Sequence, residues 1–262
     1  MNLSNNNKNK PKMSKTRKVY FLRLAGRCLI FILTILMFIF DREEFDIIKN
    51  WNYFDSFSPL HLLWAVWIWD MILQLLPVRA HISIGSQKQF SAMFKPIKEK
   101  INYINLKKHI KDTTAAAYKV FIVWVVVNMI IALLYYFRII DTATIFLISV
   151  FFYVCDLICV LIWCPFRFIM GNKCCTTCRI FNWDHLMMFA PFVMIPGFYT
   201  WTLVLFAFVI WLIWELCVFI YPERFWENSN MALRCSECTD KLCTQYCRKL
   251  RQAQAGHVFS QQ

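Results

Sequence analysis

Seven of the twelve cysteines fall in two short clusters, and these are the residues whose spacing most suggests chemistry. The first cluster is Cys174, Cys175 and Cys178. The second cluster, near the C-terminus, is Cys235, Cys238, Cys243 and Cys247. In a reducing compartment, cysteines grouped in this way bind metal more often than they form disulfides. Both clusters are therefore candidate metal sites.

The cysteines of the second cluster are spaced C-x2-C-x4-C-x3-C. This spacing resembles the ferredoxin-type motif in iron–sulfur subunits of membrane-linked oxidoreductases. The resemblance implies that these four residues ligate a [4Fe-4S] cluster that serves electron transfer, with a redox protein as partner: Cys235, Cys238, Cys243 and Cys247. The first cluster would then supply part of a second site.

Zinc is the alternative metal. The pairs Cys175-x2-Cys178 and Cys235-x2-Cys238 have the spacing of a tetrahedral four-cysteine zinc site. Such a closed site would be structural, and it would fix the C-terminal tail to the loop that carries the first cluster. The protein would then be a non-enzymatic membrane assembly or transport component.

The composition indicates an integral membrane protein. Hydrophobic residues make up 59% of the 262 residues and charged residues 17%, although the net charge is +13. These proportions exclude a disordered, collagen-like or low-complexity chain and argue against a soluble globular domain. A chain that is both apolar and basic must keep its charges apart from its membrane-spanning segments.

Apolar runs near the length needed to cross a bilayer predict an all-α bundle of five full spans. The predicted spans are Val19–Phe40, Leu60–Leu76, Ala115–Ile140, Thr142–Trp163 and Phe198–Tyr221. The segment Leu186–Ile195 is too short for an ordinary span, so we expect it to be re-entrant or a short sixth helix. Pro196 and Gly197 predict the turn that follows it.

The distribution of lysine and arginine predicts the orientation of the spans. Met1–Lys18 has six basic residues and no acids, whereas Asp41–Pro59 has five acids and two basic residues. We therefore expect a multi-pass protein of the cell membrane with both termini in the cytoplasm. Its predicted parts are a disordered basic cytoplasmic tail at 1–18, a transmembrane domain at 19–221 and a Cys-rich cytoplasmic tail at 222–262.

The loop at 77–114 has eight basic residues and two acids, which places it on the cytoplasmic side. Its apolar residues, spaced by three and four, predict an amphipathic helical face interrupted at Pro96. They are Phe90, Met93, Phe94, Ile97, Ile101 and Ile104. Because no base-stacking aromatic pattern accompanies the lysines, we expect anionic lipid headgroups as the partner and no nucleic acid.

Several ionisable residues fall within the predicted spans, where charge is costly and is usually paired or functional. They are Arg23, Arg27, Asp70, Lys119, Asp156 and Glu215. Interhelical ion pairs that hold the bundle together are the simpler interpretation. An ion or proton path through Asp70, Asp156 and Glu215 is the alternative, while Asp184 is expected to cap a helix.

The remaining cysteines lie near or within spans and are expected to pack as small apolar residues. They are Cys28, Cys155, Cys159, Cys164 and Cys217. Cys155 and Cys159 are one helical turn apart beside Asp156, which leaves a site there conceivable. The chain has no phosphate loop, nucleophile elbow or His-Glu zinc-protease motif, so catalytic residues are not identified.

Overall fold

The computed structural model describes residues 14–52, 57–76, 88–98, 100–171, 178–234, 236–237 and 242. The α-helices in this part are α1 (Lys15–Phe40), α2 (Pro59–Leu75), α4 (Tyr103–Tyr136), α5 (Thr142–Leu161), α6 (Phe166–Met170), α7 (Asp184–Phe189) and α8 (Phe198–Ile220). Short 3₁₀ segments are η1 (Arg42–Lys49), η2 (Ser91–Met93), η4 (Arg179–Trp183), η5 (Ala190–Met194), η6 (Pro222–Phe225) and η7 (Met231–Leu233). Within the described ranges, pairing of extended backbone is limited to one isolated bridge between Pro96 and Asn230.

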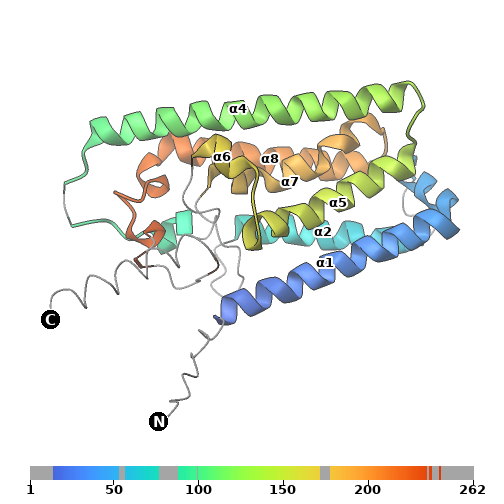
Figure 1. Ribbon diagram of the computed structural model, residues 1–262, viewed down its shortest axis with the longest axis horizontal. Coiled ribbons are helices and arrows are strands. Elements are labelled where there is room, and N and C mark those ends of the chain that lie inside the picture. The colour runs from blue at the N-terminus through green and yellow to red at the C-terminus, as the bar shows by residue number, and fades with distance from the viewer. Residues whose placement is uncertain are drawn as a thin grey trace, which may run out of the picture.

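The prediction of an all-helical fold built on long apolar helices is confirmed for the described residues. Helices α1, α4, α5 and α8 are long and apolar enough to cross a membrane, and α2 is an apolar helix of 17 residues. All five run along the long axis of the molecule (Figure 1). Large apolar side chains are exposed along the outer faces of α1 and α4, including Leu33, Ile39, Ile122, Val126 and Ile130. Exposed apolar surface of this extent is typical of contact with lipid.

Polar residues at the helix starts explain where the helices begin. Ser58 caps α2 in a capping box with His61, and Asp141 caps α5 by accepting a hydrogen bond from the Thr144 amide at 3.0 Å. Arg42 Nε donates to the other Asp141 oxygen at 2.9 Å, which ties η1 to the start of α5. Although partial burial raises the pKa of Asp141, the hydrogen bonds from Arg42 and Thr144 outweigh it and hold this pKa below its usual range.

Two boundaries differ from the sequence prediction. α1 begins at Lys15, so 15–18 are helical, while residues 1–13 of the predicted disordered tail lie outside the described part. α4 begins at Tyr103, well before Ala115, because Asn102 caps it and its first turns carry solvated lysines. The predicted amphipathic loop is not one helical face. Ser91–Met93 is a 3₁₀ turn, Pro96 pairs with Asn230, and Phe90 packs into the core.

The predicted turn at Pro196 and Gly197 is present, and it brings the chain back to the end of the bundle that carries η1. The Phe198 amide donates to the Asn50 carbonyl at 3.2 Å, and η1 packs against both α5 and α8. The preceding segment runs from Asp184, beside the last turn of α2, up to this turn. It consists of α7 followed by η5, which overlap the short segment expected at Leu186–Ile195.

Gly197 provides a test of the close approach between η1 and the start of α8. A Cβ at this position would overlap the carbonyl oxygen of Ile48, so Gly197→Ala is expected to lower the free energy of unfolding by about 1–3 kcal/mol. The measurement is equilibrium unfolding in mixed detergent micelles. Gly26→Ala, in α1 with nothing near its Cβ, is the control and should be neutral or slightly stabilising. Equal stability of the two variants would contradict the close approach of η1 to α8.

A layer of aromatic rings fills the bundle towards the η1 end. Trp67 of α2 lies at its centre, fully buried, with ring centroids 5.1 Å from Phe189 and 5.8 Å from Phe146. Phe192 and Tyr199 complete the layer and are also fully buried. These rings form a closely packed layer in that half of the bundle.

Candidate functional site

Arg27 holds three helices together at the other end of the bundle. Its Nη1 atom donates to Asp156 Oδ2 of α5 at 2.6 Å and to the Tyr153 carbonyl at 2.7 Å. Its Nη2 atom lies 3.8 Å from Asp70 Oδ2 of α2. The guanidinium also covers the Tyr153 ring at 3.8 Å from the centroid. The interhelical ion pairs expected from the sequence are therefore present between α1, α2 and α5.

A second polar group joins α2 to α7. Asp184 Oδ1 accepts hydrogen bonds from Gln74 Nε2 at 3.1 Å and from the His185 amide at 2.8 Å. His185 Nδ1 lies 3.0 Å from the same oxygen and 2.8 Å from Gln74 Oε1. Since both partners are acceptors, Nδ1 must carry the proton. The prediction that Asp184 caps this helix is wrong, because Trp183 holds the N-cap position of α7 and Asp184 is the first helical residue. No sequence pattern indicated its contact with Gln74.

A small cavity of about 40 Å³ separates these two polar groups and is lined by side chains from both. This volume is enough for water. Asp70, Asp156 and Asp184 border the cavity together with Arg23, Arg27 and His185. The aromatic layer around Trp67 lies beyond it, and the described residues there form no chain of ionisable groups across the bundle.

Glu215 belongs to a different cluster. Its carboxylate pairs with Arg179 and accepts a hydrogen bond from Trp183 Nε1 at 2.7 Å, while Arg179 Nη1 also donates to Thr114 Oγ1 at 2.5 Å. This arrangement ties α8 to η4 and α4. Glu215 thus has partners other than Asp70 and Asp156, and Asp184 and His185 are the residues that line the cavity beside those two carboxylates. The ion or proton path through Asp70, Asp156 and Glu215 stays a prediction.

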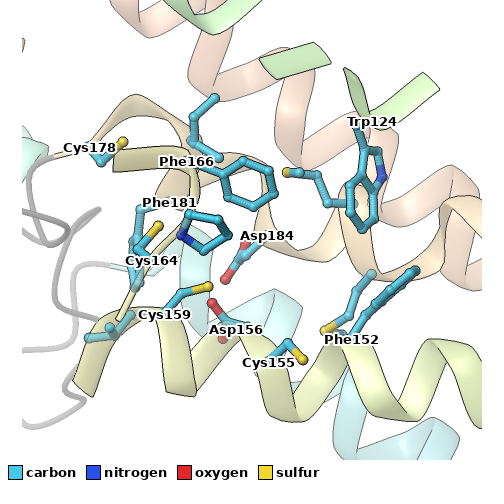
Figure 2. Close-up of a pocket in the computed structure, with 15 residues that line it drawn as sticks. Trp124, Phe152, Cys155, Asp156, Cys159, Cys164, Phe166, Cys178, Phe181 and Asp184 are labelled. Carbon is cyan, nitrogen blue, oxygen red and sulfur yellow. The ribbon is translucent and has the colours of Figure 1, made fainter. Parts of the chain in front are cut away.

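Four cysteines line one cavity of about 230 Å³ beside Arg27 and Asp156, and Figure 2 shows their thiols around it. Cys155 and Cys159 come from α5, Cys164 follows that helix, and Cys178 precedes η4. The Cys159 thiol is hydrogen-bonded to Cys164. Met187 and Met188 of α7 complete the sulfur-bearing lining. Sequence reasoning had expected Cys155, Cys159 and Cys164 to pack as apolar residues, with a site at Cys155 and Cys159 beside Asp156 as the alternative.

Of the predicted metal ligands, only Cys178 lies in the described part, where it is buried and is not in a disulfide. The others fall outside it: Cys174, Cys175, Cys235, Cys238, Cys243 and Cys247. Among the residues that the structure describes, no group of three His, Cys, Asp or Glu side chains could hold a metal ion. The ligand sets for [4Fe-4S] and zinc therefore stay predictions.

The start of the C-terminal tail is anchored on the loop before α4. Asn230 is fully buried, and its Nδ2 atom donates to the Lys88 and Arg224 carbonyls at 3.1 and 2.9 Å. The Met231 amide donates to the Lys95 carbonyl at 2.9 Å. Sequence reasoning did not identify Asn230, because a single asparagine in a polar tail carries no distinctive pattern.

Leu242 packs into a small apolar cluster that η4 also contacts through Phe181. It is buried together with Tyr20 of α1 and Leu157 of α5, and Phe181 packs against the same group. Leu242 directly precedes Cys243, and Phe181 lies three residues after Cys178. The two predicted cysteine clusters are thus attached to chain segments that meet at the same end of the bundle.

No protein-family model, curated protein or solved structure matches this chain.

Proposed function

We propose that the chain is a multi-spanning protein of the cell membrane that holds a metal centre, a [4Fe-4S] cluster, through its cytoplasmic cysteines and transfers electrons at the inner face. The burial of Leu242 in an apolar cluster that Phe181 also packs against supports this proposal, because Leu242 directly precedes Cys243 and Phe181 lies three residues after Cys178. Structural zinc is the alternative, and the same contact favours it, since that site would draw ligands from both clusters.

The proposed topology has five full spans and a short sixth segment. α2 is about 26 Å long at 1.5 Å per residue, slightly less than a bilayer core, and local thinning or flanking residues would make up the difference. The return of the chain at Gly197 to the η1 end supports a final inward span at α8. Both termini then lie in the cytoplasm, where thiols stay reduced and basic segments face anionic lipid headgroups.

The chemistry of the two metals differs. A [4Fe-4S] cluster held by the four tail cysteines would exchange single electrons with a redox protein at the membrane surface. A four-cysteine zinc site would exchange none and would stabilise the fold of the tail. The two proposals require different ligands, so single substitutions separate them.

Metal analysis of the full chain, purified without oxygen, tests the proposal. With [4Fe-4S], we expect iron and sulfide to be lost in Cys243→Ser and kept in Cys178→Ser. With zinc shared between the clusters, we expect metal loss in Cys178→Ser and none in Cys243→Ser. Cys217→Ser, in α8, is the matched control for both and should keep the metal of the parent chain.

Leu242→Asp tests the packing of Leu242 in its apolar cluster without removing a predicted metal ligand. A carboxylate placed against Tyr20, Leu157 and Phe181 should displace the tail, so that the metal is removed faster by a chelator. A colourless protein with stoichiometric zinc would overturn the electron-transfer role. A chain purified with neither metal would overturn the metal centre altogether.

A further inference from the structure

A second cavity, of about 430 Å³, lies between α4 and the segments that face it, and it is called the lateral cavity here. On α4, the lining residues follow the helical period, which places them on one face of the helix: Phe121, Trp124, Val125, Asn128, Met129 and Ala132. The opposite wall comes from η4, α7, η5 and α8, with Leu186, Ala190 and Phe208 among its residues. The lateral cavity thus separates this face of α4 from α7 and α8.

Packing on both sides of the lateral cavity holds α4 in place. Val120 is buried in an apolar cluster with Trp183, and Ile131 belongs to the main core of the bundle. The Phe121 ring lies 6.3 Å from the Trp183 ring, which lies 6.2 Å from the Trp211 ring, so these three rings close the end nearest η4. Because α4 is fixed before and after the cavity, it cannot move inwards to fill the space without losing these contacts.

The surface of the lateral cavity is apolar, although some of its lining residues carry polar atoms. Trp183 Nε1 donates to Glu215 Oε1 at 2.7 Å, and Asn128 Nδ2 donates to the Trp124 carbonyl at 2.9 Å. Asn128 Oδ1 and the Nε1 atoms of Trp124 and Trp211 are covered by neighbouring atoms. Since a water molecule needs two to four polar partners, water is a poor occupant of this cavity.

Hydrocarbon is the medium at the opening of the lateral cavity. The opening lies between α4 and α8, where Val125, Met129 and Phe208 are exposed on the surface that the proposed spans present to the bilayer. An unfilled cavity leaves its lining atoms without dispersion contacts on one side, which favours entry of an apolar group. Along α4 the lining extends from Phe121 to Ala132, about 16 Å at 1.5 Å per residue. This length is about half of a bilayer core, the depth that one acyl chain covers in one leaflet.

We infer that the lateral cavity binds one acyl chain of a membrane phospholipid. The chain enters sideways from the bilayer and packs between α4 and α8, where it supplies the dispersion contacts that the protein alone leaves unmade. The headgroup stays at the membrane surface, which agrees with a lining that has no Asp, Glu, Lys or Arg side chain. This inference rests on the membrane-spanning topology proposed above and is independent of the metal centre proposed for the tail.

Photo-crosslinking of the full chain in lipid nanodiscs tests the site without any variant. The probe is phosphatidylcholine with a diazirine group in one acyl chain. We expect label on the cavity wall at Leu186 and Trp211, as well as on the exposed α4 residues Ile122 and Val126, which report the surrounding lipid. Label on Ile122 and Val126 without label on the wall would overturn the inference. Absence of label at all four positions would refute the spanning topology, and the inference with it.

Filling the lateral cavity provides the matched comparison. Ala132→Leu/Ala190→Leu adds carbon atoms from both walls, in the space that the chain occupies, so labelling of Leu186 and Trp211 should be lost. Ala25→Leu makes the same change at an exposed position of α1 outside the cavity and should label as the parent chain does. Unchanged labelling of the wall in a monodisperse, folded double variant would contradict binding in the cavity.

Native mass spectrometry of the detergent-purified chain identifies the occupant. Annular lipid is removed by detergent before a chain held between α4 and α8, so we expect a phospholipid adduct on the parent chain and on Ala25→Leu. The adduct should be lost in the double variant that fills the cavity. A sterol or a quinone as the adduct that the double variant loses would overturn the assignment to a phospholipid.

Discussion

Arg27→Met is expected to lower the free energy of unfolding by about 3–5 kcal/mol, the cost of leaving a buried charge without its partner. The Arg27 side chain is 12% exposed and that of Asp156 15% exposed, and the two are joined by the 2.6 Å contact between Arg27 Nη1 and Asp156 Oδ2. Methionine preserves much of the apolar packing of the arginine stem, so the decrease in the free energy of unfolding reports the removal of the positive charge. Equilibrium unfolding in mixed detergent micelles provides the measurement.

Two companion variants make this result interpretable. Arg42→Met breaks the pair with Asp141. The Arg42 and Asp141 side chains are 55% and 46% exposed, so the loss of this pair should leave the free energy of unfolding nearly unchanged. Adding Asp156→Asn to Arg27→Met removes the stranded carboxylate and should restore part of the stability. If Arg27→Met and Arg42→Met cost the same, Arg27 does not act as the buried counter-charge of the bundle.

Hydropathy predicted the spanning helices because a bilayer demands long apolar runs whatever the packing within them. It therefore located α5 and α8 to within two residues of their observed bounds, and Pro196 and Gly197 marked the turn between segments. Hydropathy did not predict the first turns of α4, because these turns carry polar residues such as Lys107 and Lys108. The Asn102 cap was the signal that would have corrected that boundary.

The contacts within the site were harder to predict, because hydropathy gives the depth of a residue and says little about the direction it faces. Glu215 and Asp70 fall at comparable depth, yet Glu215 faces Arg179, whereas Asp70 faces Arg27. Cys164 was predicted as an apolar residue near the end of a span. Its approach to Cys159 depends on the chain leaving the α-helix after Leu161, which a hydropathy pattern does not resolve.

Trp67→Ala is expected to lower the free energy of unfolding by about 3–5 kcal/mol, since it empties the centre of the aromatic layer. Trp67 is fully buried and its ring lies within 6.3 Å, centroid to centroid, of Phe146, Phe189 and Tyr199. Trp69→Ala is the matched control two residues further along α2. Its side chain is 59% exposed on the apolar surface, so its loss should change stability by no more than about 0.5 kcal/mol.

Trp67→Phe separates packing from hydrogen bonding at the same position. Among the described residues, the Trp67 Nε1 atom is buried and has no hydrogen-bond partner, a state that costs about 1–3 kcal/mol. Phenylalanine removes this unpaired donor, which stabilises the fold, and leaves a small void, which destabilises it. Because these effects offset each other, the free energy of unfolding should fall by at most about 1 kcal/mol. If Trp67→Phe instead destabilises the protein as much as Trp67→Ala, the indole N–H group has a partner. The aromatic layer would then contain a polar contact, and the packing around Trp67 would not be wholly apolar.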